Sequence, residues 1–148
     1  MASLTSPTAI VLLSLHPQYV DAILRGDKKV EFRRRGFRRD VSHVVMYSTT
    51  PVGRIMGVFA VDGVEQGPPR ELWAHHRDVA GLSERSFYEY YRGARSGVAI
   101  RIGSAQPLDT PLDLQQLNGD FSAPQSFRYL QPRDLPNALR SMLASTSA

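Results

Sequence analysis

The first third of the chain combines three patterns in immediate succession, and their order strongly constrains the fold. Residues 9–15 form a short apolar run rich in β-branched and aliphatic side chains, which predicts a buried strand. Residues 17–25 carry apolar side chains at helical spacing, with a proline in the first turn and a glycine directly after, so they predict a helix. Residues 28–34 alternate, with Val30 and Phe32 on one face of a second predicted strand. The chain therefore opens with a strand, a helix and a strand.

The later elements do not alternate regularly between strand and helix. Strands are predicted at residues 43–47, 54–61, 97–102 and in the last aromatic stretch of 121–130. Helices are predicted around Leu72 and Trp73, at 84–91 after a Ser83 cap, and at 133–143. Such an order favours an α+β fold, with a small mixed or antiparallel sheet curled into a β-barrel and flanked by helices. We expect one domain over residues 9–143, with a flexible N-terminus at 1–8 and a flexible C-terminus at 144–148.

Length and composition exclude several classes of protein. A chain of 148 residues suits one domain whose core needs no covalent staples. The absence of cysteine excludes a disulfide framework, a thiolate nucleophile and a Cys-ligated zinc site. The apolar run at residues 9–13 is far shorter than the about 20 residues that span a bilayer, and it lacks the features of a signal peptide. We therefore expect a cytoplasmic protein with no membrane partner.

Positive charge is concentrated in residues 25–39. This window holds eight basic and two acidic residues, a net +6, whereas the whole chain carries +4. The cations that we assign to a nucleic-acid surface are Lys29, Arg34, Arg35, Arg38 and Arg39. Charges spaced along a strand can track successive phosphates, but solvated side chains that guard a sheet edge give the same pattern. Charge alone leaves both interpretations open.

Lys28 and Lys29 are the two lysines of a chain that otherwise uses arginine. An ammonium group shifts its pKa when it is buried, which a guanidinium group does not. Glu31 lies close enough in sequence to keep a lysine charged, or to act itself as an acid or base. An ordinary ion pair worth under about 1 kcal/mol is the plain alternative.

Other candidate sites are weaker. His75 and His76 are adjacent, so on a helix they are expected to point in different directions, and no ligand pattern in the sequence completes a metal site. We therefore predict no metal and no cofactor. Trp73 and the aromatic residues of 87–91 are candidates for base stacking, although helical spacing more often places such residues in a core.

Residues 13–33 hold a predicted helix that ends in the pattern Gly-x-Lys-x-x-Glu-x-Arg. The matching residues are Gly26, Lys28, Glu31 and Arg33. This pattern resembles the signature of ASCH domains, a branch of the PUA-like superfamily. Residues 47–51 and 124–129 are similar to a turn and to the closing strand of one bacterial subgroup of that family.

The resemblance implies a small β-barrel with a ligand cleft beside the motif strand. Related modules bind RNA or modified bases, and bacterial relatives are described as predicted transcriptional regulators. We therefore predict a module that binds RNA or a modified nucleoside. The residues predicted to bind the ligand are Ser14, His16, Lys28, Glu31, Arg33, Tyr47, Ser48, Gln125 and Ser126.

The alternative is a hydrolase in which Lys28 and Glu31 are catalytic. Some small ASCH proteins are amidohydrolases of acetylated cytidine that use the motif lysine, a threonine and a distant acid. Here Glu31 stands at the threonine position and Asp78 is the candidate acid, and a carboxylate cannot replace a hydroxyl nucleophile in that reaction. Other relatives are reported as ribonucleases, in which a Lys/Glu/Arg trio would act as acid, base and phosphate clamp.

A third possibility is a small-molecule sensor or a protein-interaction domain whose charged window only aids solubility.

One geometric requirement applies to the first two hypotheses. Strict strand alternation would place Lys28 and Glu31 on opposite faces, so a shared cleft requires an irregular backbone near residues 26–28.

Overall fold

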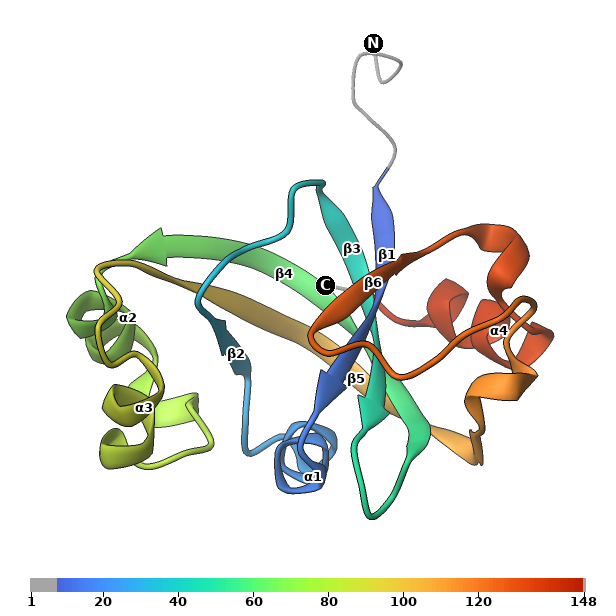
Figure 1. Cartoon of the computed structure of the whole chain (residues 1–148), viewed down its shortest axis with the longest axis horizontal. Helices are drawn as coiled ribbons and strands as arrows, with labels where there is room; N and C mark the ends of the chain where they lie inside the picture. The colour runs from blue at the N-terminus through green and yellow to red at the C-terminus, as the bar shows by residue number, and fades with distance from the viewer. Residues whose placement is uncertain (1–7, 148) are drawn as a thin grey trace, which may run out of the picture.

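A six-stranded sheet organises the chain in the computed structural model, which describes residues 8–147 (Figure 1). The strands are β1 (Ala9–Leu15), β2 (Val30–Arg33), β3 (Val41–Ser48), β4 (Arg54–Gly67), β5 (Gly97–Leu112) and β6 (Phe127–Leu130). Their order across the sheet is β2-β5-β4-β3-β1-β6. Strands β1 and β3 are parallel and the other neighbours are antiparallel, so the predicted mixed sheet is confirmed.

The helices flank this sheet. They are α1 (Pro17–Arg25), α2 (Pro69–His76), α3 (Glu84–Tyr90) and α4 (Asn137–Ser145), with short 3₁₀ helices η2 (Arg77–Val79), η3 (Leu114–Gln116) and η4 (Pro132–Asp134). Helix α1 has the predicted bounds, because Pro17 starts it and Gly26, at a φ of 85°, ends it in the left-handed conformation. Helix α3 begins after the predicted cap, since the Ser83 hydroxyl accepts a hydrogen bond from the Ser86 amide at 3.1 Å.

The predicted barrel is wrong, because the sheet is open. Its two edges are β2 and β6, each four residues long, and no strand pairing joins them in the described part of the chain. Side chains cross the seam instead: Arg33 donates to the Ser126 hydroxyl at 2.5 Å, and the Phe37 and Phe127 rings lie 4.9 Å apart. Strands this short offer few backbone groups for a closing ladder, so the curled sheet is fastened by side-chain contacts.

Strands β4 and β5 are much longer than predicted. The part of β4 beyond residue 61 pairs with the first residues of β5, where Gly67 faces Gly97. The part of β5 beyond residue 102 pairs with the first half of β4, where Leu112 faces Ile55. The second half of β4 alternates between half-buried and exposed residues, and β5 contains Pro107 and Pro111. In a single sequence, glycines and prolines indicate turns, so they end a predicted strand early. The full length of β4 and β5 becomes apparent only from their pairing with each other.

Three clusters of buried apolar residues hold the layers together. One lies under α1 and includes Val11 and Leu13, and a second lies under α4 and includes Leu12 and Leu139. Strand β1 is therefore buried on both faces, as its unbroken apolar run predicts. A third cluster joins β2 to α2 and α3 around Phe87.

The predicted flexible ends fall partly outside the described residues, which exclude 1–7 and 148. At the C-terminal side, α4 continues to Ser145 and Thr146 is buried. The Thr146 carbonyl lies 2.8 Å from the Nε2 atom of His43, and the Ser147 carbonyl accepts from the Ser104 amide at 3.0 Å. The segment 144–147 thus packs against the sheet. No helix among the described residues is both long enough and apolar enough to cross a bilayer.

Candidate functional site

A cavity of about 310 Å³ lies where the end of β1, the helix α1, the strand β2 and the helix α3 meet. The residues that line it are Ser14, Leu15, His16, Tyr19, Lys28, Glu31, Phe32, Arg33, Thr49, Leu82, Ser86, Phe87, Tyr90 and Gln125. The polar groups come mainly from the motif strand and from the β1–α1 junction, whereas α3 contributes mostly aromatic surface.

The irregular backbone required by the motif is present. After Gly26 the chain does not enter β2 until Val30, and the Lys28 amide still donates to the Ala22 carbonyl of α1 at 3.1 Å. Lys28 therefore lies outside the strand, and its side chain does not follow strand alternation. Its Nζ atom is 3.9 Å from a carboxylate oxygen of Glu31, so both residues face the same cavity.

Lys28 is almost completely buried, with 2% of its surface exposed. Its ammonium group donates to the Ala80 carbonyl at 2.6 Å and lies 5.1 Å and 5.5 Å from the ring centres of Tyr19 and Phe32. Burial lowers the pKa of Lys28, and the nearby Glu31 carboxylate offsets part of that shift. Lys28 therefore gives up its proton more readily than a solvated lysine does.

Glu31 and Arg33 continue a chain of charges from Lys28 toward β6. Glu31 is buried and accepts a hydrogen bond from Arg33 at 3.2 Å through the oxygen that does not face Lys28. Arg33 then reaches Ser126 across the sheet seam. The carboxylate is thus held between two cations, and the guanidinium is held at the cavity wall.

Gly81 shapes the space that Lys28 occupies. It has a φ of +71°, and a Cβ atom added there would lie 2.6 Å from the Cβ and Cγ atoms of Lys28. The neighbouring residue Ala80 provides the carbonyl that accepts from the lysine. The short segment between η2 and α3 therefore both packs against the lysine and binds its charged end.

Of the nine residues predicted to bind the ligand, six line the cavity: Ser14, His16, Lys28, Glu31, Arg33 and Gln125. Ser126 lies beside it, bonded to Arg33. Tyr47 and Ser48 are buried and do not line the cavity, and Tyr47 belongs to the core under α4. Asp78, the candidate distant acid, is exposed in η2 and is also absent from the cavity wall.

Several lining residues were not predicted as ligand contacts, among them Tyr19, Phe32 and Thr49. The aromatic residues of α3 divide in two: Phe87 and Tyr90 border the cavity, whereas Tyr91 is buried, which raises its pKa, and lies 2.8 Å from the Arg33 carbonyl. The aromatic spacing in 87–91 was the available signal, but it does not say which ring faces a cavity.

The cations assigned to a nucleic-acid surface are exposed: Lys29 directly precedes β2, and the four arginines follow it. Arg34, Arg35 and Arg39 line a second, wider groove of about 880 Å³, together with the acids Asp40 and Asp62. Arg34 is tied back to the protein, because it donates to the carbonyls of Tyr90 and Arg92. Lys29 and Arg38 are exposed and line neither the cavity nor this groove. The acids reduce the positive potential of the groove.

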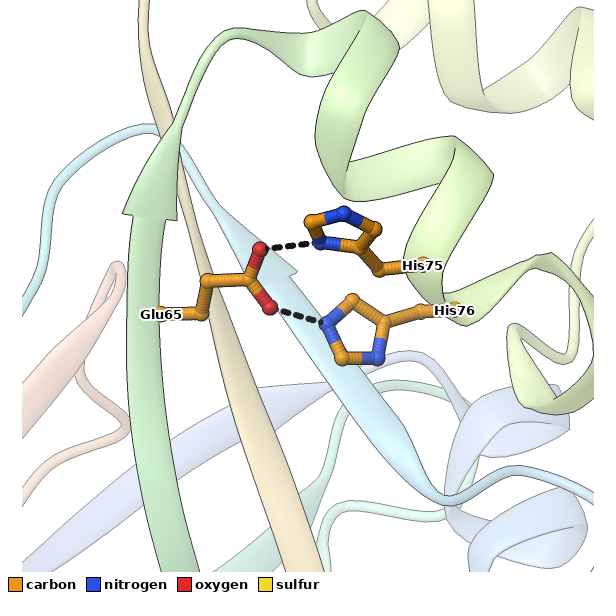
Figure 2. A group of neighbouring side chains, drawn as sticks. All are labelled: Glu65, His75 and His76. Carbon is orange, nitrogen blue, oxygen red and sulfur yellow. Dashed lines mark hydrogen bonds and ion pairs between the residues drawn. The ribbon is translucent and has the colours of Figure 1, made fainter.

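The expectation that His75 and His76 point in different directions is wrong. Both rings contact the carboxylate of Glu65 from β4, as Figure 2 shows. This cluster lies outside the cavity wall, although His76 packs edge-on against Phe32 with ring centres 6.3 Å apart.

The fold and the motif geometry together define an ASCH domain. The chain belongs to this family, whose profile, described as ASCH domain, matches residues 13–103. The predicted family is therefore confirmed, and the fold fits the PUA-like superfamily.

Individual relatives agree with this assignment. The chain is 32% identical over 127 residues to the "ASCH domain-containing ribonuclease" of Zymomonas mobilis subsp. mobilis. The aligned region covers 83% of this chain and 85% of that protein. The crystal structure of ASCH from Zymomonas mobilis has a TM-score of 0.79 at 30% identity and covers 93% of this chain and 96% of that one. The N-terminal domain of Staphylothermus marinus McrB shares the fold alone, with a TM-score of 0.57 at 11% identity and coverage of 92% and 93%.

Replacing Gly81 by Ala should destabilise the protein more than replacing Gly93 by Ala. Both glycines have positive φ, so each substitution costs about 1–2 kcal/mol of backbone strain. Only at Gly81 does the new methyl group collide with Lys28, which adds about 1–3 kcal/mol, because nothing lies within 4 Å of a Cβ at Gly93. Denaturant unfolding of both variants measures the difference, and equal losses would contradict this role of Gly81.

Raising the pH toward 10.5 should increase the free energy of unfolding of the wild type relative to that of the Lys28→Met variant. The folded-state pKa of Lys28 lies below its ordinary 10.5, so between these two values the unfolded chain binds more protons than the folded one. The cost of burying the charge is therefore full below the folded-state pKa and is relieved as pH rises through it. Denaturant unfolding at a series of pH values below 10.5 measures the difference between the two proteins, and a constant difference would contradict the lowered pKa.

Proposed function

We propose that this protein cleaves RNA in the cavity beside the motif strand. The observation that carries the proposal is the buried chain of charges Lys28–Glu31–Arg33, which opens into a cavity of about 310 Å³. An acid, a base and an anion clamp, with the carboxylate 3.9 Å from the ammonium and 3.2 Å from the guanidinium, are the groups that phosphodiester cleavage requires. The relative of 32% identity that is named a ribonuclease supports RNA as the substrate.

The size of the cavity favours a single strand. A volume of 310 Å³ is at the lower end of the roughly 300–1,000 Å³ typical of small-ligand sites, so it suits one nucleotide and excludes a duplex. Tyr19, Phe32 and Tyr90 bring aromatic side chains to the wall, where a splayed base can stack. RNA would therefore enter with one unpaired nucleotide and its 3′-phosphate in the cavity and the rest of the strand outside.

RNA carries its own nucleophile, the 2′-hydroxyl. In the proposed reaction the Glu31 carboxylate accepts the 2′-hydroxyl proton as this oxygen attacks phosphorus. The bond from phosphorus to the 5′-oxygen breaks, and the Lys28 ammonium gives its proton to that leaving oxygen. Arg33 lies beside the phosphate oxygens, where a guanidinium stabilises the developing charge. The products are a 2′,3′-cyclic phosphate and a 5′-hydroxyl end.

The lowered pKa of Lys28 supports its part in this scheme. A general acid works best when its pKa approaches the working pH, and burial moves Lys28 in that direction. The other groups of the cavity would position the substrate: Ser14 and Gln125 lie at the end of the cavity near β6, and His16 lies at the start of α1.

Binding without cleavage is the second candidate function. Lys28 already donates to Ala80 and Glu31 already accepts from Arg33, so the charged groups are held in place as a recognition site requires. In that case the cavity would bind an unpaired or modified nucleoside of an RNA, and no bond would break.

Single-turnover cleavage of an unstructured RNA oligomer separates these functions. Wild-type protein should release fragments with cyclic phosphate ends, whereas DNA of the same sequence should stay intact because it lacks the 2′-hydroxyl. Lys28→Met and Glu31→Gln should each lower the cleavage rate constant by about 10²–10⁴-fold, the usual contribution of a general acid or base.

Lys29→Met is the matched control, because Lys29 is exposed outside the cavity and its loss should leave the rate constant at saturating RNA unchanged. Wild-type protein that binds RNA and produces no fragments would support the second candidate instead. Release of acetate from acetylated cytidine would support the amidohydrolase alternative.

Salt dependence tests the surface around β2. Arg35 and Arg38 are exposed, and among the described residues no hydrogen bond or ion pair involves their guanidinium groups, although the Arg38 backbone amide donates to the Tyr129 hydroxyl. The double variant Arg35→Gln/Arg38→Gln should reduce the slope of log affinity against log salt by about 2, one for each lost phosphate contact. Fluorescence anisotropy with labelled RNA measures the slope.

Arg133→Gln, in η4, serves as the matched control for a change of surface charge. An unchanged slope in the double variant would assign these arginines to solubility rather than to RNA binding.

A further inference from the structure

Glu65, His75 and His76 bring three metal-binding side chains to one point outside the cavity (Figure 2). Glu65 lies near the end of β4, and the two histidines are the last residues of α2. The Nδ1 atom of His75 is 2.5 Å from one carboxylate oxygen, and the Nε2 atom of His76 is 2.7 Å from the other. All the potential ligand atoms lie within 4.8 Å of one another.

The two adjacent histidines converge because they use different ring nitrogens. Neighbours on a helix are about 100° apart around its axis, so equal side chains would diverge. His75 presents its near nitrogen, Nδ1, and His76 its far nitrogen, Nε2, so the unequal reach of the two rings compensates for the angle. Helix α2 folds back onto the end of β4, which puts Glu65 where both rings can meet it.

We infer that Glu65, His75 and His76 bind a divalent transition-metal ion of the Zn²⁺ class. Two imidazoles and one carboxylate suit Zn²⁺, Ni²⁺ and Cu²⁺, whereas Mg²⁺ and Ca²⁺ prefer all-oxygen sites. Bonds of about 2.0–2.2 Å to one ion place two ligand atoms at most about 4.3 Å apart. The present ligand atoms lie within 4.8 Å of one another, so a small rotation of one ring would bring them to distances that one ion can bridge. His75 can make that rotation, because its side chain is 57% exposed.

The cluster provides both an anchored and an open side. The His76 side chain is only 10% exposed and is held against Phe32, so it is already ordered before an ion binds. The exposed His75 leaves the outer side accessible to solvent, and three protein ligands leave a fourth position for water.

The two carboxylate oxygens of Glu65 are now occupied by hydrogen bonds with His75 and His76. A metal ion would take the place of the protons that now lie between the nitrogen atoms and the carboxylate oxygens, as ligand binding by imidazole and carboxylate demands.

An ion here would fasten α2 to β4 and steady one wall of the cavity. His76 contacts Phe32, which lines the cavity and lies 5.5 Å from the Lys28 ammonium. Helix α2 also packs on α3 through Trp73 and Phe87, whose rings are 4.9 Å apart. The proposed metal is structural and takes no part in the proposed RNA chemistry, so either proposal can fail without the other.

Titration of untagged, metal-free protein with Zn²⁺ by calorimetry tests the site. We expect one ion per chain, and Mg²⁺ in large excess should not displace it. Glu65→Gln and His75→Ala should each weaken binding by more than the roughly 10- to 100-fold that loss of an outer-shell partner costs. His16→Ala, which removes an exposed histidine of the cavity, is the matched control and should bind as the wild type does.

Thermal unfolding provides an independent readout. Zn²⁺ should raise the Tm of the wild type by mass action and leave that of His75→Ala unchanged. His75 is exposed, so this variant should fold as the wild type does, and circular dichroism checks that it does. Absence of a saturable site, or Zn²⁺ binding that survives unchanged in both ligand variants, would overturn the proposal.

Discussion

The rest of the candidate site depends on the burial of Lys28 beside Glu31. A buried ammonium group loses its hydration, and the protein compensates with the Ala80 carbonyl, the Glu31 carboxylate and two aromatic rings. These four groups come from three segments of the chain, so one side chain ties α1, β2 and the η2–α3 connection together. Apolar residues in place of a buried ion pair are often as stable or more so, and stability alone therefore explains this pair poorly.

The open seam of the sheet explains where the cavity lies. A closed barrel would satisfy the edges of β2 and β6 with a backbone ladder and would fill the space between them. Here the edges meet through Arg33 and Ser126, and the cavity opens beside this contact. The same arginine also donates to Glu31, so one side chain both bridges the seam and orients the carboxylate.

The layer made by α2 and α3 forms one side of the cavity. It rests on the third apolar cluster around Phe87 and on the contact of two histidines with Glu65, and it supplies both the aromatic wall of the cavity and the Gly81 segment. A metal at Glu65 and a ligand in the cavity would act on the two sides of Phe32. The ordering of this layer is therefore the physical link between the two proposals.

The local elements and the motif were predictable from the sequence. The first strand, the helix over 17–25, the Ser83 cap and the family followed from periodicity, turn chemistry and the Gly-x-Lys-x-x-Glu-x-Arg pattern, because these depend on neighbours within a few positions. Six of the nine predicted ligand contacts line one cavity for the same reason, since most of them flank that motif or the β1–α1 junction.

The remaining features depend on contacts between segments that are distant in the chain. Whether the sheet closes, how far β4 and β5 extend, and which aromatic rings of α3 face the cavity depend on partners distant in sequence. Tyr47 and Asp78 were predicted at the site, but the register of β3 buries one and η2 exposes the other. His75 and His76 would diverge on an ideal helix. They both contact Glu65 because α2 folds back onto the end of β4, where Glu65 lies. Spacing along a chain specifies a face of one element, and only packing specifies what that face meets.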